Sequence, residues 1–546
     1  MDKEYFDSSA PKVRYTPFGI FVDQAGYTPE RRKIGVMPFE ADDFTVCDEN
    51  GNVVFTGKTV HFGYDEDSGD TVCTADFSEL KTEGSYRVHA GGRTSAVFRI
   101  GGDVYDKLLY DTSKAYYYLR CGCALEPKYA GVYQHKPCHC SAASLYEDDS
   151  ITLDVSGGWH DAGDYGRYVT AGAVAAAHLL YAYRLFPKAF DDLKLDIPDG
   201  AMPDILTEIR YELEWLLKMQ REDGGVYHKV TTMQHAPFVM PEDDTAPLVV
   251  FPVSSMAVAD FTAVTALASG IYKKFDNSFA EVLCKAAKKS AEWLEAHPEF
   301  IDFKNPDGCN TGGYYERDDF SNRYWAYAEM YSLTGDTLYK DKMLAQMAKN
   351  FPLTEFGYGE VGGLGSLAYL LAENGSSDET ADMLKKAFGD HAERLKKLSE
   401  NSGYGLALDR AGYHWGSNMS VMKNGMAFAV NYLLNGDEAA KEYAANQLDY
   451  LMGKNALGIS YVSGIGEFRV NELHLRPAFA DGIDECMPGM VSGGPNKGLS
   501  DPFAQAVIPS DTPPMKCFAD LPASYSLNEI TIYWNSPAVF VLAFLK

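Results

Sequence analysis

Short apolar runs separated by turn residues fill the first hundred positions of the chain and predict β-strands. Between residues 16 and 101 these runs are rich in Val, Ile, Phe and Tyr. The Asn50-Gly51 pair lies between two of them, as in a tight β-hairpin. About seven such strands in roughly 85 residues predict a small immunoglobulin-like β-sandwich, which we place at residues 1–101.

From about Tyr105 the apolar positions recur with the period of a helix instead. Ile205, Ile209 and Leu213 share one helical face, for example. Long loops rich in Gly, Pro, Asp and aromatic residues separate the helical stretches, and loops of this length are commonly functional. About a dozen helices over residues 102–546 fit a closed double ring of helices. The helices are predicted near residues 169–181, 205–217, 255–273, 279–295, 321–333, 337–349, 379–399, 418–434, 437–452 and 529–545.

The composition narrows the range of partners. The 546 residues include 77 acidic and 49 basic ones, which gives a formal net charge of −28. Such an acidic chain repels phosphate groups, so we expect neither nucleic acid nor an anionic membrane as a partner. The chain has no run of about 18 apolar residues, so no membrane span is expected. Aromatic residues make up 13% of the chain, which is enough to provide flat faces for sugar rings in addition to core packing.

The N-terminus and the cysteines indicate a compartment. The chain begins with Met and has no apolar signal segment, which favours a cytoplasmic protein; a secreted protein whose signal has been removed is the alternative. Ten cysteines in 546 residues do not form a disulfide framework. No organic cofactor is expected.

A glycine-rich segment, DVSGGWHDAGDYGRYV at residues 154–169, carries the first candidate for chemistry. Asp161 and Asp164 lie three residues apart with only Ala and Gly between them, so both carboxylates are uncrowded. Aspartates are also common at helix N-termini, where the dipole and capping favour them. The neighbouring Trp159 and the glycines favour a functional site over simple capping.

The second candidate is Glu529, near the C-terminus. It opens an almost wholly apolar predicted helix, so its carboxyl is expected to be poorly solvated and to hold a proton near neutral pH. A dipole position at a helix start is the structural alternative. An aspartate pair at one place and a lone, apolar-flanked glutamate at another is the pattern of glycoside hydrolysis, with one acid and one base.

A third group combines soft and imidazole ligands. Cysteines and histidines of this kind suit a closed zinc site, although free buried cysteines also behave as small hydrophobic residues. The group comprises Cys121, Cys123, Cys138, His139, Cys140 and His160.

Together these segments resemble glycoside hydrolase family 9, the cellulases, in the subgroup with an N-terminal immunoglobulin-like domain. FVDQAGYTPERRKIGV resembles the opening strands of that domain, and GGWHDAGDYGRYV resembles the family's catalytic-base loop. FADLPASYSLNEITIYWNS resembles its general-acid signature, and YVSGIGEFRVNELHLRP its His-x-Arg segment. The resemblance implies a mainly α fold, with an (α/α)6 barrel at residues 102–546 after the β-sandwich.

The resemblance also implies roles for individual residues. Asp164 corresponds to the general base, Asp161 helps to hold the water, and Glu529 corresponds to the general acid. The family's reaction is inversion through a single displacement by water, with the two catalytic carboxyls roughly 6.5–9.5 Å apart. His474 and Arg476 are expected to bind the sugar nearest the scissile bond.

Aromatic residues and one departure bear on substrate preference. Trp325, Tyr413 and Trp415 are candidates for stacking on sugars, although each of them suits a protein core equally well. After a Gly-Ile-Gly run the family usually has a basic or amide residue, where this chain has Glu467 and Phe468. That difference concerns the preference of the subsites and not catalysis.

Some members of the family bind a structural zinc that ties two loops to the base loop. The residues that match its ligands are Cys121, Cys138, His139 and His160. Calcium is also common in the family, but the acidic pairs at residues 243–244 and 318–319 have no diagnostic spacing.

The leading prediction is a cellodextrinase, an inverting hydrolase of β-1,4-glucosidic bonds in cello-oligosaccharides. It follows from the absence of a signal and of an appended binding module, and from long loops at residues 223–253 and 101–150 that are expected to wall off part of the cleft. An endo-β-1,4-glucanase acting on soluble cellulose or mixed-linkage glucan is the alternative, followed by an exo-β-glucosaminidase. A non-catalytic sugar-binding protein is disfavoured by the intact Asp161, Asp164 and Glu529.

Overall fold

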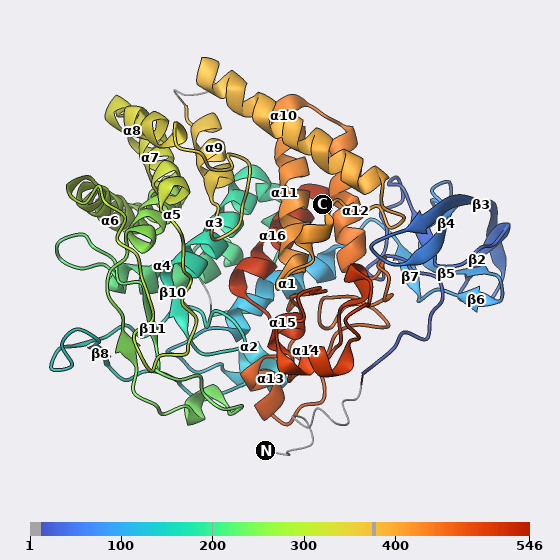
Figure 1. The fold of residues 1–546 in the computed structure, drawn as a ribbon, viewed down its shortest axis with the longest axis horizontal. Helices are drawn as coiled ribbons and strands as arrows, with labels where there is room; N and C mark the ends of the chain where they lie inside the picture. The colour runs from blue at the N-terminus through green and yellow to red at the C-terminus, as the bar shows by residue number, and fades with distance from the viewer. Residues whose placement is uncertain (1–12, 199, 374–377) are drawn as a thin grey trace. The chain divides into compact units, whose positions relative to one another are not determined.

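The computed structural model describes residues 13–198, 200–373 and 378–546, and the chain divides into two compact units (Figure 1). The first unit consists of the chain up to Ala115 together with His391–Lys546, and the second of Tyr116–Asp390. The first unit therefore joins the N-terminal strands to the last helices of the chain.

The first unit contains a seven-stranded antiparallel sheet in the order β1-β4-β3-β2-β5-β6, with β7 paired to β5. Its inward side chains form a closed core in which Tyr27, Phe77 and Phe98 meet edge to face or tilted. The β2–β3 turn contains Gly51 at φ 80°, a left-handed conformation that confirms the predicted hairpin. The strands are β1 (Ile34–Met37), β2 (Asp43–Asp48), β3 (Val53–Asp65), β4 (Asp70–Asp76), β5 (Gly84–Ala90), β6 (Arg93–Thr94) and β7 (Phe98–Ile100).

Helices follow for the rest of the chain, and largely buried helices alternate with helices that keep an exposed face. Burial covers most of α3, α5, α7, α9, α11 and α16, whereas α4, α6, α8 and α10 are exposed along one side. The helices are α1 (Asp106–Tyr118), α2 (Pro127–Ala130), α3 (Val169–Leu185), α4 (Asp204–Lys218), α5 (Ser255–Tyr272), α6 (Asn277–Ala296), α7 (Phe320–Thr334), α8 (Thr337–Met347), α9 (Gly362–Leu370), α10 (Glu379–Glu400), α11 (Ser417–Asn435), α12 (Ala439–Leu451), α13 (Arg476–Ala480), α14 (Pro502–Val507), α15 (Tyr525–Asn528) and α16 (Ile532–Leu545).

The packing within each unit follows this alternation. In the second unit α3 packs on α4 and α5, α5 on α6 and α7, and α7 on α8 and α9. In the first unit α16 packs on α11 and α12. Small residues such as the Ala run of α3 let buried helices approach closely. Helices α3, α5 and α7 therefore each contact both an amphipathic partner and the next buried helix, as expected for a double ring of helices.

Helix α5 alone among the described helices has the length and mean hydropathy to cross a membrane. Its 18 residues are 94% buried inside the structure, as expected for a helix at the centre of a helical core.

The loops that precede α3, α5 and α7 are the ones that position the candidate site in the second unit. A five-stranded sheet of very short strands joins the first two of these loops to the segment after α2, in the order β10-β11-β12-β8-β9. The strands are β8 (Ala143–Leu145), β9 (Thr152–Leu153), β10 (Arg167–Tyr168), β11 (Lys229–Thr231) and β12 (Val249–Val250). The two segments nominated as a cleft wall therefore belong to the same sheet as the end of the aspartate loop.

Candidate active site and metal centre

The aspartate loop, residues 154–168, is closed by its own hydrogen bonds. The backbone N–H of Asp161 donates to the carbonyl of Gly166 at 2.9 Å. Arg167, which is 1% exposed, donates to carbonyls of the same loop, among them that of Gly157 at 2.9 Å. Both carboxylates of the pair are buried, Asp161 at 2% and Asp164 at 6% exposure. The loop thus holds two acidic side chains in fixed, largely dry positions.

Each carboxylate has distinct partners. The Tyr168 hydroxyl donates to Asp164 Oδ2 at 3.0 Å, and His235 Nδ1 lies 3.4 Å from the same oxygen. The Tyr314 hydroxyl donates to Asp161 Oδ2. The second oxygen of Asp161, Oδ1, is buried and has no hydrogen-bond partner in the described part of the chain. One oxygen of the pair is thus left able to accept a hydrogen bond from a water or a substrate.

Burial and mutual repulsion shift the titration of this group. Burial raises the pKa of Asp161 well above its usual range, and the charge of Asp164 adds to the effect, while the bond from Tyr314 opposes it. Burial and the two carboxylate charges likewise raise the pKa of Tyr168, so its hydroxyl stays protonated and acts as a donor. Gly166 makes this arrangement feasible, because a Cβ there would lie 2.5 Å from the Tyr168 hydroxyl.

In the first unit, Glu529 occupies a different position from the one predicted. It does not open the last helix: it lies in an extended conformation, φ −68° and ψ 157°, between α15 and α16. Thr531 caps α16 instead, with its side chain accepting from Trp534 N. The helix-start explanation for this carboxylate therefore does not apply.

Backbone pairing brings the His-x-Arg segment beside Glu529. His474 and Glu529 form an isolated parallel bridge, and His474 N donates to Asn528 O at 2.9 Å. His474 Nδ1 lies 2.7 Å from the carbonyl of Pro522, which orients the ring and directs Nε2 away from that contact. Arg476, 5% exposed, begins α13. The structure thus brings His474 and Glu529 together in one unit.

Asp520 is a residue that sequence reasoning missed. It is buried and accepts from Asn471 N at 2.9 Å, Glu472 N at 3.0 Å and Asn528 Nδ2 at 2.8 Å. It therefore joins the His-x-Arg segment to the residue directly before Glu529. Its place in the FADLP sequence, within the general-acid signature, was the available signal.

The candidate stacking residues separate clearly. Trp415 is 42% exposed, and its ring lies 5.1 Å from that of Tyr525, which lies 6.0 Å from that of His474. Trp325 has no exposed surface and donates to Glu329 within α7, and Tyr413 is 3% exposed. Their rings belong to the core, which corrects the prediction that they stack on sugars. Tyr525, four residues before Glu529, was missed.

The departure at Glu467 and Phe468 has a structural explanation. Glu467 accepts from Arg87 at 2.9 Å and from the backbone N–H of Val97 at 2.9 Å, both in the β-sandwich. The backbone of Phe468 bonds to the Gln24 side chain in both directions. These positions serve the contact between the sandwich and the helical part of the first unit, which corrects their assignment to substrate preference.

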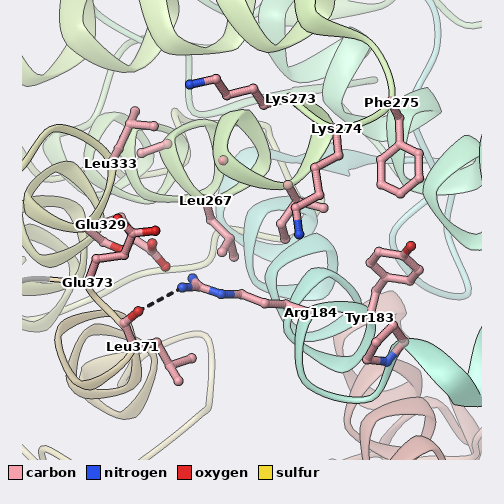
Figure 2. Close-up of a pocket in the computed structure, with 15 residues that line it drawn as sticks. Tyr183, Arg184, Leu267, Lys273, Lys274, Phe275, Glu329, Leu333, Leu371 and Glu373 are labelled. Atoms are coloured by element: carbon pink, nitrogen blue, oxygen red, sulfur yellow. Dashed lines mark hydrogen bonds between the residues drawn. The ribbon is translucent and has the colours of Figure 1, made fainter. Parts of the chain in front are cut away.

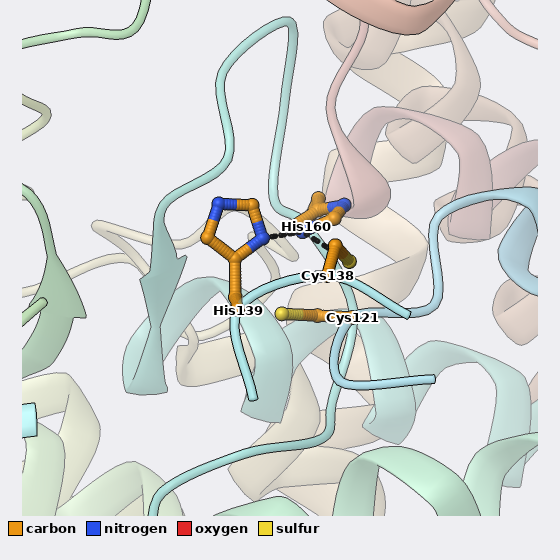
Figure 3. A group of neighbouring side chains, drawn as sticks. All are labelled: Cys121, Cys138, His139 and His160. Carbon is orange, nitrogen blue, oxygen red and sulfur yellow. Dashed lines mark hydrogen bonds between the residues drawn. The ribbon is translucent and has the colours of Figure 1, made fainter. Parts of the chain in front are cut away.

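The four predicted zinc ligands converge in the second unit (Figure 3). Their ligand atoms all lie within 4.8 Å of one another, and all four residues are buried. The separation of His139 Nδ1 and His160 Nε2 is 3.3 Å, which matches the edge of about 3.3 Å that a tetrahedron with zinc–nitrogen bonds of about 2.0–2.1 Å requires. Cys138 and His139 are neighbours, and the left-handed backbone of His139, φ 49°, lets both side chains face one centre. The residues therefore fit a structural zinc ion.

The surroundings of the metal site explain one of the acidic pairs. Asp244 Oδ2 lies 3.2 Å from His139 Nε2, the arrangement in which a carboxylate orients a metal-binding histidine. In the other pair, Asp319 forms a buried ion pair with Arg323 at 2.7 Å. Asp244 and Asp319 thus have partners other than calcium.

A separate cavity of about 500 Å³ lies at the C-terminal ends of the helices α3, α5 and α7 (Figure 2). It is lined by the C-terminal turns of α3, α5 and α7, and by the residues that follow α9. Arg184 there donates to the carbonyl of Leu371 at 3.0 Å. Cations are expected where helix C-termini converge, because the orphan carbonyls attract them. Asp161 and Asp164 precede the opposite end of α3, so this cavity is not part of the acidic site.

A pair of buried carboxylates held in a fixed loop on a helical scaffold is typical of a glycoside hydrolase. The model of glycosyl hydrolase family 9 matches residues 105–542, and that of the cellulase N-terminal ig-like domain matches residues 16–95. The chain belongs to glycosyl hydrolase family 9.

Full-length relatives agree with this assignment. A cellodextrinase of Butyrivibrio fibrisolvens is 46% identical, over 96% of this chain and 99% of its own length. A single mutant of a thermostable endoglucanase from Alicyclobacillus acidocaldarius superposes with a TM-score of 0.92 at 35% identity, over 97% of this chain and 99% of its own. A zinc-binding triple mutant of a family 9 endoglucanase gives a TM-score of 0.89 at 35% identity, over 95% and 99%. The predicted fold class, an (α/α)6 barrel after an immunoglobulin-like domain, is confirmed.

Proposed function

We propose that this glycosidase is an inverting cellodextrinase in which Asp164 is the general base and Glu529 the general acid. The observation that carries the proposal is that the two aspartates have different hydrogen-bond partners. Asp164 is held by Tyr168, whereas Asp161 keeps a buried oxygen without a partner among the described residues. A water bound to Asp161 would be oriented for attack while Asp164 removes its proton.

The remaining roles follow from the neighbourhood of the acid. Glu529 would give its proton to the leaving oxygen, so that the sugar departs as a neutral alcohol. Inversion needs the two carboxyls far enough apart to admit a water beside the anomeric carbon. His474, with Nδ1 bound to Pro522, would offer Nε2 to a sugar hydroxyl, and Trp415 with Tyr525 would supply a stacking surface.

Two isosteric variants test the assignment of acid and base. Asp164→Asn and Glu529→Gln should each lower kcat on cellotetraose by about 10²–10⁴-fold without lowering Tm. Glu214→Gln, an exposed carboxylate on α4, is the matched control and should keep full activity. Near-normal turnover by either variant would remove that residue from its role. Polarimetry or NMR of the first product should show the inverted anomer.

The preference for short substrates rests on the 46% identical cellodextrinase and on the sheet beside the aspartate loop. The loop at residues 223–253 reaches the acidic pair through His235, and Val239 O accepts from the Tyr165 hydroxyl. Chain segments so close to the reacting centre would wall off part of a groove and admit chain ends. Activity per enzyme should be higher on cellotetraose than on carboxymethyl-cellulose, whose viscosity should fall slowly relative to the reducing ends released.

An endo-β-1,4-glucanase is the second candidate, because the structure of TM-score 0.92 is that of an endoglucanase. A rapid fall in viscosity at low conversion would decide for it. Both candidates share the same acid and base, so this measurement concerns only the extent of the groove.

The metal centre would be a structural zinc site. Two thiolates and two imidazoles would hold the ion, with Asp244 orienting His139. Zinc there would fasten segments that are distant in sequence to the aspartate loop and would take no part in the displacement. Metal analysis of protein purified without chelator should find about one zinc per chain.

A further inference from the structure

Lys229 is a buried ammonium ion without a counter-ion at contact distance. It is 0% exposed, and its three N–H donors go to neutral acceptors: Asn305 Oδ1 at 2.7 Å, Thr311 Oγ1 at 2.9 Å and the carbonyl of Gly312 at 2.7 Å. Within the described ranges, no carboxylate lies within 4 Å of Nζ. A buried charge without an ion pair is costly, so its retention needs an explanation.

Aromatic side chains around Nζ help to stabilise the buried charge. Aromatic rings lie around it, with centroids at 4.5 Å for Phe251, 5.5 Å for Phe303 and 5.6 Å for Tyr168. Cation–π contacts of this kind partly replace lost hydration. Burial lowers the pKa of Lys229 only to about 8, so the side chain remains charged at neutral pH.

Hydrogen bonds on both sides of Gly312 link this ammonium to the acidic pair. Lys229 donates to the carbonyl of Gly312, and the N–H of Gly312 donates to the Tyr168 hydroxyl at 2.9 Å. That hydroxyl, already accepting from Gly312, donates its own proton to Asp164 Oδ2 at 3.0 Å. The strand that carries Lys229 also pairs with the end of the aspartate loop, Tyr168 opposite Lys229. Lys229 is thus joined to the proposed base by both side chain and backbone.

We propose that Lys229 is the positioning residue of the general base: its ammonium group fixes the loop at residues 305–312 so that Tyr168 holds Asp164, and its charge offsets that of the aspartate pair. The inference rests on the proposed role of Asp164. Lys229 acts through Tyr168 and does not touch the substrate. The ionisable groups that interact electrostatically with Lys229 are Cys309, whose Sγ lies 3.7 Å from Nζ, and Asp164.

The test compares Lys229→Met, which keeps the length of the side chain and removes its charge, with Lys33→Met. Lys33 is equally buried and also bonds only to neutral acceptors, the carbonyls of Pro29 and Arg31, but it belongs to the β-sandwich. Both variants should lower Tm. Only Lys229→Met should lower kcat on cellotetraose, by about 10–100-fold with little change in KM, because the base is misplaced.

The pH profile separates positioning from general destabilisation. In Lys229→Met the acid limb of kcat/KM should move to higher pH by about half a unit or more, since the carboxylates lose a nearby cation. The groups that face Asp164 in this profile are Asp161, Tyr168, His235 and Lys229. An unmoved limb, or an equal loss of kcat in Lys33→Met, would overturn the proposal.

Two further variants keep the result interpretable. Thr311→Val removes one acceptor and keeps the ammonium, so it should lower kcat by a smaller factor without moving the acid limb, and it tests the positioning role even if Lys229→Met does not fold. In an Asp164→Asn background Lys229→Met should have no additional effect on kcat. An additive effect there would refute action through Asp164. Full activity of Asp164→Asn alone would instead refute the assignment of the base, which is a distinct outcome.

Discussion

Glu212 offers a sharp test of how burial governs the stability of the aspartate loop. The side chain lies on α4 and is 1% exposed; Oε2 accepts from the backbone N–H of Trp159 at 2.7 Å, whereas Oε1 has no partner among the described residues. Burial raises the pKa of Glu212 to about 8, from an ordinary value of 4.5. We expect Glu212→Gln to preserve the bond to Trp159 and to remove the titration.

The sign and size of the effect follow from linkage. The folded chain keeps the Glu212 proton up to about pH 8, and the unfolded chain loses it above about pH 4.5. Stability from this group is complete below pH 4.5 and is lost as the pH rises towards 8, by about 1 kcal/mol at pH 5 and about 4 kcal/mol at pH 8. Glu212→Gln does not lose stability in this way, so the difference in free energy of unfolding between the variant and the wild type grows with pH in favour of the variant.

Scanning calorimetry at pH 5 and pH 8 measures the difference. For a chain of 546 residues, the extra 3 kcal/mol or so corresponds to a rise of about 3 °C in the Tm of the variant relative to wild type between the two pH values. Glu214→Gln, two residues along the same helix with an exposed side chain, should show no such dependence. A Tm difference for Glu212→Gln that is the same at both pH values would refute the reasoning.

Three other perturbations have expected outcomes. Cys138→Ser, or removal of the metal by a chelator, should lower Tm by calorimetry more than it changes KM, because the ligands join three separate segments of the chain. Tyr314→Phe should lower kcat on cellotetraose about 10-fold with a smaller change in KM, since Asp161 loses a hydrogen-bond donor and the ring volume is kept. Glu208→Gln should lower the free energy of unfolding in urea by about 3–5 kcal/mol, because it leaves the buried Arg120 guanidinium without its anionic partner.

Each of these three has a result that counts against it. Protein that contains no zinc and keeps its Tm in a chelator would end the structural-metal proposal. Unchanged turnover of Tyr314→Phe would show that the bond to Asp161 is dispensable. A loss below about 1 kcal/mol in Glu208→Gln would place the ion pair with Arg120 among the weak ones.

Periodicity predicted most of the architecture because its signals are local. The apolar runs and the turn at Gly51 predicted the β-sandwich, and helices α5, α6 and α7 lie within about two residues of their predicted bounds. Helix α9 (Gly362–Leu370) was missed, since its three glycines oppose helix formation in isolation. Packing decides that segment: a Cβ at Gly365 would lie 2.5 Å from the ring of Tyr324.

The site was predictable only where a motif or the chemistry of the ligands was compact. The zinc set and the aspartate pair lie in short segments, and the structure brings the zinc set together. Tyr314 and Lys229 lie in loops far from the aspartates in sequence, and single residues of those types carry no pattern. Trp325 was misjudged because exposure of a ring depends on tertiary packing and not on its neighbours in the chain.

The junction between β10 and α3 has a mechanical consequence. Tyr168 ends the strand and Val169 begins the helix, and the N–H of Val169 already bonds to His228 O at 3.1 Å on the adjoining segment. With no intervening residue, the small sheet is joined directly to a helix of the core and cannot move independently of it. The neighbouring loop, residues 232–248, connects β11 and β12 of the same sheet. Because His235 and Val239 of this loop contact Asp164 and Tyr165, a change in the loop would act on the aspartates directly, whereas the strands at its base hold the aspartate loop against α3.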